Sequence, residues 1–312
     1  MPCPMLILLV LLVLWLPLPV ASASLTLDIV LSGRSAPYLE AAKALRRNLA
    51  SELFGEERVS TWLLEDWLAR RQPPASVVVT LGTRAARRLV SLPGDYKLLS
   101  AMITASAYRL IADSKQSRRP WAAIVLDQPA HRYVHLIDEL LPEARRLGLL
   151  YGDDSRHMLE ALEAAGKVHH LVVQTTAVQP GDNVAKAIKR LIRGSDVILA
   201  LPDPLALSPQ NAKWLLYMAY QQGIPVIGYS HALAKAGALA ALYTTPQQIG
   251  RETAEFLNRY GADGSFPAVM SMARYFEVAL NPWVARSLHV DVPGEEELSR
   301  RLHGQEGSHG AE

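Results

Sequence analysis

Apolar and polar positions alternate along this chain in two distinct ways. Short runs that are apolar almost throughout, such as residues 76–81 (SVVVTL) and 196–201 (DVILAL), are typical of strands buried on both faces of a sheet. Between them lie longer stretches in which apolar residues recur at helical spacing, as in residues 36–53 and 208–222. The pattern predicts an α/β protein in which strands and helices alternate.

The predicted elements fall into two series. The first has strands at residues 25–31, 76–81, 97–104 and 122–126, with helices at residues 36–53 and from Thr83 onward. The second has strands at residues 147–151, 170–175, 196–201 and 224–229, with helices at residues 129–141, 159–166, 184–193 and 208–222. Two such series predict two doubly wound parallel-sheet lobes. Ligands bind such sheets at the carboxyl ends of the strands, so two facing lobes would form a cleft.

The first residues predict export. Residues 5–16 are an unbroken apolar run, Pro17 and Pro19 follow it, and residues 21–23 (ASA) form a small-residue cleavage site. We therefore expect a signal peptide at residues 1–23, cleavage before Ser24 and a periplasmic mature protein. The alternative is a retained membrane anchor, because no Lys or Arg precedes the run, although a spanning helix needs about 20 apolar residues.

Composition narrows the function classes. A length of 312 residues favours two domains, and a net charge of +2 gives no attraction for nucleic acid. The single cysteine, Cys3, precedes the apolar run, so neither lipid attachment at the cleavage point nor a disulfide is expected. Residues 294–312 are charged and contain Gly and His, and we expect a disordered tail there.

Several segments, in order, resemble one protein family. They are residues 140–142 (LLP), 147–151 (LGLLY), 196–225 (DVILALPDPLALSPQNAKWLLYMAYQQGIP), 237–242 (GALAAL), 248–255 (QIGRETAE) and 275–293 (YFEVALNPWVARSLHVDVP). Together they resemble the ABC-transporter substrate-binding family that includes tryptophan- and tyrosine-binding members. The first half of the chain resembles the family only in its order of strands and helices.

The resemblance implies a type I periplasmic-binding-protein fold whose two lobes are joined by a three-segment hinge. Lobe 1 would comprise residues 24–126 and 244–274, and lobe 2 residues 127–243 and 275–293. The implied function is capture of a small organic solute, such as an amino acid, and its delivery to an ABC permease. A periplasmic sensor or accessory module without a permease is the alternative. Residues 104–108 (TASAY) and 203–205 (DPL) depart from the family pattern, so the ligand cannot be carried over.

The candidate ligand contacts of the first lobe follow three strands. Glycine lets a backbone approach a ligand closely, and a helix that begins directly after a strand offers free N–H groups to an anion. The competing interpretation is an ordinary tight turn or a capped helix with a solvated basic face. The candidates are Ser32, Gly33, Gly82, Thr83, Thr104 and Ser106.

The candidates of the second lobe also follow strands. Asp203 could pair with a ligand amine or cap the next turn, and the resemblance aligns it with a cleft position. Tyr151 and Tyr229 offer a stacking face and a hydroxyl, and Ser230 stands beside Tyr229. We expect Thr83 and Asp203 both to contact the ligand. Changing them together should then abolish ligand-induced stabilisation without lowering the melting temperature of the apo protein.

Catalytic and metal chemistry have weaker signals. Residues 228–232 (GYSHA) resemble a hydrolase nucleophile elbow around Ser230, but the last glycine is replaced by Ala232. His131 and His135 have i, i+4 spacing, yet zinc would need further ligands. We therefore expect no enzyme activity, metal or cofactor, and a secreted serine hydrolase remains only an alternative. Trp62 and Trp67 are expected to pack rather than to bind.

Overall fold

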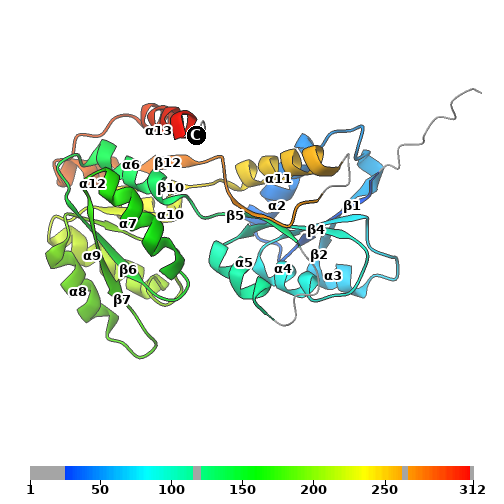
Figure 1. Ribbon diagram of the computed structural model, residues 1–312, viewed down its shortest axis with the longest axis horizontal. Coiled ribbons are helices and arrows are strands. Elements are labelled where there is room, and N and C mark those ends of the chain that lie inside the picture. Colours follow the sequence, from blue (N-terminus) through cyan, green and yellow to red (C-terminus); the bar gives the residue numbers. More distant parts are fainter. Residues whose placement is uncertain (1–24, 115–120, 262–265, 310–312) are drawn as a thin grey trace, which may run out of the picture.

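The computed structural model describes residues 25–114, 121–261 and 266–309. It consists of two lobes side by side, each with its own sheet (Figure 1). The α/β class and the two doubly wound lobes expected from the sequence are confirmed. The expected signal peptide lies outside the described residues. Within the described ranges, none of the helices combines the length and the apolar character needed to cross a bilayer.

The sheet of lobe 1 is parallel throughout. Its strand order is β11-β5-β4-β3-β1-β2, and each described pair runs in the same direction. Apolar residues fill the inner strands, and the strand β1 is buried along its whole length. The strands are β1 (Leu27–Leu31), β2 (Val59–Leu63), β3 (Val77–Leu81), β4 (Lys97–Ile103), β5 (Ala122–Val125) and β11 (Met270–Met272).

The sheet of lobe 2 repeats this plan with one reversed edge. Its order is β12-β10-β9-β8-β6-β7, and only β12 runs antiparallel to its neighbour. The strands are β6 (Arg146–Tyr151), β7 (Val172–Ala177), β8 (Val197–Leu199), β9 (Val226–Gly228), β10 (Ala240–Tyr243) and β12 (Glu277–Leu280).

Helices cover both faces of each sheet, because alternate strand residues enter separate hydrophobic clusters. In lobe 1, one face carries α2 (Ala36–Asn48) and α11 (Pro246–Gly261). The other carries α3 (Leu64–Ala69), α4 (Thr83–Val90) and α5 (Ala105–Ala112). The short helix η1 (Glu56–Arg58) precedes β2.

In lobe 2, one face carries α6 (Ala130–Leu140), α7 (Leu159–Val168), α12 (Pro282–Ser287) and α13 (Glu295–His309). The other face carries α8 (Val184–Gly194) and α9 (Pro209–Gln221). The short helices η2 (Arg156–Met158) and α10 (His231–Ala236) complete the lobe.

The chain crosses between the lobes three times. It leaves lobe 1 between β5 and α6, returns between β10 and α11, and crosses again between β11 and β12. The three connections run together in the middle of the molecule (Figure 1). A three-segment connection of this kind allows the two lobes to move about a common hinge.

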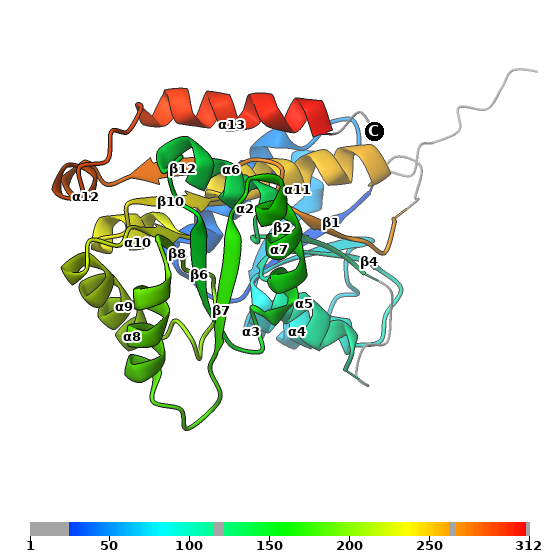
Figure 2. The same cartoon turned by 60° about the vertical axis from the view of Figure 1, so that its left-hand side comes forward.

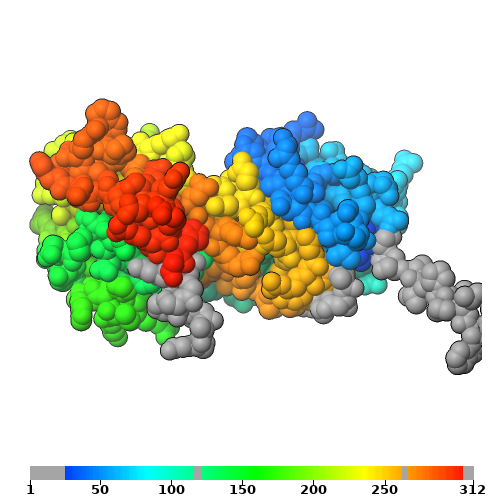
Figure 3. Space-filling model, turned by 90° about the horizontal axis from the view of Figure 1, so that it is seen from above, coloured from blue at the N-terminus to red at the C-terminus, as the bar shows by residue number. Residues whose placement is uncertain are grey.

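The expectation that residues 294–312 are a disordered tail is wrong for residues 295–309, which form α13. Leu298 and Leu302 are buried against lobe 2, and the His303 ring stacks on Phe276 with ring centroids 4.1 Å apart. Figures 2 and 3 show α13 lying along the hinge side of the molecule, over α6. Two leucines at i, i+4 give this charged helix one apolar stripe, which is enough to dock it.

The strand β2 was not predicted, because it is an edge strand whose residues are only partly buried. It is held by a buried carboxylate on β1. The indole N–H groups of Trp62 and Trp67 donate to the two oxygens of Asp28, both at 2.9 Å. Both tryptophans therefore have packing roles, as expected.

Candidate functional site

The strand order of each sheet contains one switch point, where successive connections leave in opposite directions. In lobe 1 it lies between β1 and β3, and in lobe 2 between β6 and β8. The loops that diverge from such a point leave a crevice at the carboxyl ends of the strands, where doubly wound proteins bind ligands. The predicted contacts Ser32, Gly82 and Thr83 stand at the first switch point, and Tyr151 and Asp203 stand at the second.

At the switch point of lobe 1, the loops after β1 and β3 are tied together. Ser32 N donates to Leu81 O at 2.9 Å, and Ser32 Oγ accepts from Ala85 N at 2.9 Å, so this serine caps α4. Arg84 donates from Nε to Ser32 O at 3.0 Å and forms an ion pair with Glu65 at 2.5 Å. The first-turn amides of Thr83 and Arg84 are left as the donors that an anionic ligand could use.

Gly82 makes this close approach possible. Its φ is +99°, and a Cβ atom there would lie 2.6 Å from both Ser32 Oγ and the Tyr38 hydroxyl. We expect Gly82→Ala to lower the free energy of unfolding by about 2–3 kcal/mol, from backbone strain plus the clash. Gly181→Ala is the matched control, because Gly181 has φ +93° and no atom within 4 Å.

Urea denaturation of both variants separates the two effects. Gly181→Ala should cost only the strain, about 1–2 kcal/mol. Equal losses in the two variants would show that the loops after β1 and β3 do not pack as described.

At the switch point of lobe 2, Asp203 joins the loops after β6 and β8. Its side chain is 3% exposed. Oδ2 accepts from Gly152 N at 2.9 Å and from Ser155 N and Oγ at 3.1 and 2.8 Å. Oδ1 accepts from Leu205 N and Ala206 N at 3.0 and 2.8 Å. Burial alone would raise the pKa of Asp203, but these hydrogen bonds outweigh it and hold the pKa below its ordinary value.

The pairing of Asp203 with a ligand amine stays a prediction, and in this structure both carboxylate oxygens already accept hydrogen bonds from the protein. Five donors occupy a carboxylate that has about four lone-pair sites. Asp203 instead fixes the shape of the two loops that line the lobe 2 side of the cleft. The alternative interpretation was a carboxylate that caps the next turn. The bonds from Leu205 and Ala206 agree with it, and the bonds from Gly152 and Ser155 add a tie to the loop after β6.

Two contacts show that the carboxyl ends of the two sheets face each other. Ser106, in α5 of lobe 1, donates from Oγ to Asp154 Oδ1 of lobe 2 at 2.6 Å. Asp127, at the first crossing, accepts from Ala105 N at 2.7 Å and lies 3.5 Å from His157 Nε2. Ser106 thus bridges the lobes directly, and its role as a ligand contact stays a prediction.

The corner around these contacts is nearly closed. It encloses about 10 Å³ between residues of the first crossing and the loops of lobe 2, including Asp127, Gln128, Ser155 and His157. A cavity of that size barely holds one water molecule. This pocket, whose walls come from the first crossing and lobe 2, is therefore too small for an organic ligand.

The remaining predicted residues divide into helix caps and residues that do not cap a helix, of which Tyr151 and Tyr229 pack against the hydrophobic clusters of lobe 2. Thr104 caps α5 by accepting from Ala107 N at 3.2 Å, and Ser230 caps α10 by accepting from Leu233 N at 3.3 Å. Tyr229 is half-buried, and burial raises the pKa of its hydroxyl. Gly33, Thr83 and Tyr151 are partly exposed after their strands and stay candidates for ligand contact.

The histidine pair belongs to a larger cluster on α6 and α7. The ring of His135 lies 5.9 Å from that of His131 and 4.8 Å from that of His169, centroid to centroid. His169 Nδ1 lies 3.2 Å from Asp138 Oδ2. Across the described ranges, no group of three or more His, Cys, Asp or Glu side chains has the arrangement of a metal site.

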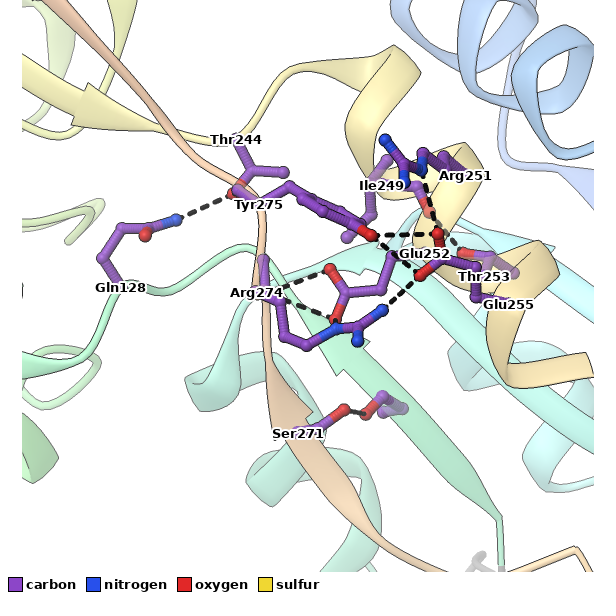
Figure 4. Close-up of polar contacts among 12 residues, drawn as sticks. Gln128, Thr244, Ile249, Arg251, Glu252, Thr253, Glu255, Ser271, Arg274 and Tyr275 are labelled. Atoms are coloured by element: carbon purple, nitrogen blue, oxygen red, sulfur yellow. Dashed lines mark hydrogen bonds and ion pairs between the residues drawn. The ribbon is translucent and has the colours of Figure 1, made fainter. Parts of the chain in front are cut away.

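The hinge is a hydrogen-bonded unit that joins all three crossings. Gln128 Nε2 donates to Thr244 Oγ1 at 2.8 Å, and Thr244 Oγ1 donates to Tyr275 O at 2.8 Å (Figure 4). Arg132 is 6% exposed and donates to Gln128 Oε1 and to Ala273 O, both at 2.7 Å. Each crossing is thereby tied to the other two.

Two glutamates of α11 hold the third crossing against lobe 1 (Figure 4). Glu252 accepts from Arg274 N, with the shorter contact at 3.0 Å, and its burial raises its pKa. Glu255 accepts from the Tyr275 hydroxyl at 2.9 Å and pairs with Arg251 at 2.9 Å and with Arg274. This end of the hinge is fixed to α11, so closure would turn lobe 2 about it.

Sequence reasoning missed the residues that join the lobes. Asp127, Gln128 and Arg132 follow β5, and Asp154 and His157 follow Tyr151. One signal was available: the polar residues Asp127 and Gln128 stand directly after a buried strand at the expected first crossing. The partners could not be identified, because Thr244, the partner of Gln128, lies 116 residues away in the chain, and Arg274, a partner of Arg132, lies 142 residues away.

The chain is similar to proteins of one family. The family described as ABC transporter substrate binding protein matches residues 71–300, which is most of the chain. Among curated proteins, none matches the chain significantly.

Solved structures share its fold at low sequence identity. A conserved domain protein from Vibrio cholerae superposes with a TM-score of 0.61 at 19% identity, covering 89% of this chain and 98% of that one. An ABC domain in complex with L-Trp from Streptococcus pneumoniae gives 0.61 at 20% identity, covering 87% and 96%. The ligand-free, open structure of a substrate-binding protein with adhesive properties from Clostridium difficile gives 0.64 at 15%, covering 87% and 97%. The fold is that of type I periplasmic binding proteins.

Proposed function

The chain belongs to the ABC transporter substrate-binding protein family, and from that premise we propose that it captures a small organic ligand between its lobes and delivers it to a membrane permease. One observation carries the proposal. Both switch points lie at the carboxyl ends of their sheets, and these ends face each other where Ser106 of lobe 1 donates to Asp154 of lobe 2. A ligand that contacts both switch points favours the closed arrangement, because it gains contacts there that an open arrangement lacks.

The proposed contacts come from both lobes. Lobe 1 offers Gly33 and the first-turn amide of Thr83, which suit a carboxylate or another anionic group. Lobe 2 offers the rings and hydroxyls of Tyr151 and Tyr229, which suit an organic side chain. An amino acid or a similar small organic acid has both features. The proposed place of action is the periplasm, since the first 23 residues have the pattern of a cleaved signal peptide.

Binding rather than catalysis is proposed, and the geometry around Ser230 supports this choice. Its Oγ accepts from Leu233 N as the cap of α10, and the ring of the adjacent His231 stacks on Tyr243 at 5.8 Å. That imidazole is thus engaged with another ring and not with the serine. Replacing Ser230 with alanine should leave a broad esterase assay unchanged.

A thermal-shift screen with amino acids, small peptides, sugars, nucleosides and organic acids tests the proposal. A ligand at about 100 times its Kd contributes about 2.7 kcal/mol, which should raise the Tm by roughly 5 °C or more. If no member of these classes shifts the Tm, capture of a small organic ligand is contradicted.

The bond between the lobes gives a sharper test once a ligand is found. Ser106→Ala or Asp154→Ala removes a contact that holds the lobes together, so we expect the Kd to rise about three- to tenfold. The Tm of the apo protein should change little, because the bond is only partly buried. Isothermal titration calorimetry measures the Kd.

Asp153→Ala is the matched control, since its exposed carboxylate pairs only with Arg156 of its own loop. The double variant should be no weaker than either single variant, because both remove the same bond. Additive losses would indicate that Ser106 and Asp154 act separately on the ligand.

A further inference from the structure

Large aromatic side chains are exposed at the end of lobe 2 that points away from lobe 1. Trp214, Tyr217 and Tyr220 of α9 are 45%, 60% and 48% exposed, and Trp283 of α12 is 76% exposed. Figure 1 shows α9 and α12 at this distal end, with α8 beside them. Tyr217, Tyr220 and Trp283 line one groove together, and a cluster of exposed aromatic rings is typical of a surface that binds a partner.

Two grooves run between these helices. The first has a volume of about 460 Å³ and lies between α9, the end of α10 and α12, with Tyr217, Tyr220 and Trp283 among its walls. The second has a volume of about 360 Å³ and lies between α8 and α9. Tyr217 lines both, so it forms the ridge between two open grooves.

The charged residues of the helices at this end all have one sign. The four helices α8, α9, α10 and α12 contain seven Lys and Arg residues and no Asp or Glu, although the whole chain is nearly balanced, with 32 basic and 30 acidic residues. Lys213 borders the first groove, and Lys189 and Arg193 border the second. The Arg286 guanidinium lies 4.3 Å from the centre of the Trp283 ring. The exposed aromatic rings and the basic side chains thus lie along the same two grooves.

We propose that this aromatic and cationic face of lobe 2 binds the surface of a bilayer that contains anionic lipids. Trp and Tyr rings favour the headgroup region of a membrane, where one side of the ring is apolar and the other is hydrated. Lys and Arg side chains near an anionic surface each contribute favourably and extend their heads toward the lipid phosphates. The face combines both features.

A bilayer accounts for the whole face better than an acidic protein segment does. Such a segment would occupy one groove, whereas a lipid surface contacts the rings of both helices and the cations along both grooves. Binding there would leave lobe 1 and the three crossings away from the membrane surface, because α8 and α9 lie at the opposite end of lobe 2 (Figure 1). The inference goes beyond the proposed function and does not depend on which ligand the cleft takes.

Vesicle co-sedimentation tests this proposal. A chain beginning at Ser24 is suitable, because every described element starts after it and the apolar N-terminal run is then absent. We expect binding to phosphatidylcholine vesicles with about a third phosphatidylglycerol and little binding to phosphatidylcholine alone. Raising the salt from about 0.1 M to about 1 M should release the protein, because the Debye length falls from about 10 Å to about 3 Å.

Two variants of the face should weaken binding. Lys189→Glu with Arg193→Glu reverses two charges at i, i+4 and should lower vesicle affinity at least about tenfold. Trp283→Ala with Tyr217→Ala should lower it by a similar factor, and more at high salt, where the rings supply most of the remaining affinity.

Matched controls lie on α2 of lobe 1. Lys43→Glu with Arg47→Glu makes the same charge change at i, i+4 on the exposed face of α2, and Leu39→Ala removes an exposed apolar side chain. Neither control should alter vesicle affinity more than about twofold.

The proposal is overturned if the unchanged chain does not bind anionic vesicles, or if the α2 charge variant weakens binding as much as the α8 charge variant does. Binding of polyglutamate without binding of vesicles would overturn it in favour of an acidic protein partner.

Discussion

Replacing Asp203 with alanine should lower the free energy of unfolding by about 3–5 kcal/mol. The change removes a buried carboxylate and leaves the amides of Gly152, Ser155, Leu205 and Ala206 without their acceptor. Each buried N–H group that loses its acceptor costs about 1–3 kcal/mol unless water replaces it. Urea denaturation followed by circular dichroism measures the loss.

Asp196→Ala is the matched control. Asp196 stands at the amino end of β8 and Asp203 follows its carboxyl end, and the pKa of both carboxyls is lowered. Asp196 is 31% exposed and accepts from Arg145 N, Arg146 N and the Arg146 side chain. Since water can replace these hydrogen bonds, Asp196→Ala should lower the free energy of unfolding by no more than about 1 kcal/mol. Equal losses at the two positions would contradict the anchoring role of Asp203.

The stabilisation from Asp203 should also depend on pH. A carboxyl group whose pKa is lower in the folded than in the unfolded protein stabilises the fold above its unfolded pKa, about 3.9. That contribution is lost as the pH falls below this value through the folded pKa. The difference in free energy of unfolding between wild type and Asp203→Asn should therefore be constant from about pH 6 to about pH 8, where both the folded and the unfolded carboxyl are ionised. The difference should shrink in acid.

This result would revise the expectation for the double change at Thr83 and Asp203. From the sequence, that change should abolish ligand-induced stabilisation and leave the apo protein as stable as before. With Asp203 buried under five hydrogen bonds, the apo protein should instead be much less stable. Only Thr83, at the open first turn of α4, can be changed as a test of ligand contact alone.

Arg132→Ala should have a comparable effect, about 3–4 kcal/mol of unfolding free energy, and should also loosen the hinge. The guanidinium donates to Gln128 Oε1, Ala273 O and Arg274 O, and it lies 4.5 Å from the centre of the Phe276 ring. Its removal leaves buried acceptors on two of the three crossings without a donor. Chemical denaturation measures the stability, and small-angle X-ray scattering measures the spread of lobe arrangements.

Arg132→Lys and Arg301→Ala complete the comparison. Lysine keeps the charge but lacks the planar fork, so it should recover only part of the lost stability. Arg301 is half-exposed and forms ion pairs with Glu139 and Glu297 at the surface, so its loss should leave the Tm close to that of the wild type. A scattering profile unchanged in Arg132→Ala would indicate that the hinge is held by Gln128, Thr244 and Glu252 without it.

Most of the strands that bury both faces were predicted from their apolar runs, although the buried strand β10 was not. The runs of β3, β6 and β8 could be recognised because strands covered by helices on both sides are mostly apolar at successive positions. The edge strand β2 and the docked helix α13 lack this signal. In both cases a few contacts decide the structure: Trp62 and Trp67 with Asp28, and Leu298 and Leu302 with lobe 2.

The positions of the candidate residues at the ends of the strands were predictable from the sequence, but their hydrogen-bonding roles were not. Loops after parallel strands meet at one edge, so the positions of Ser32, Gly82, Tyr151 and Asp203 follow from strand order alone. What each side chain does depends on its nearest donors and acceptors. For Asp203 and Ser106 these are groups about 50 residues away in the chain, at Gly152 and Asp154.

The sequence by itself thus determined the α/β class and the two lobes, because periodicity reports which side of an element is buried. The tertiary structure alone decided that Asp203 is an anchor, that Ser106 bridges the lobes and that Arg132 ties the hinge. The physical reason is range: burial patterns are local along the chain, whereas hydrogen bonds between loops and between lobes depend on atoms brought together only by folding.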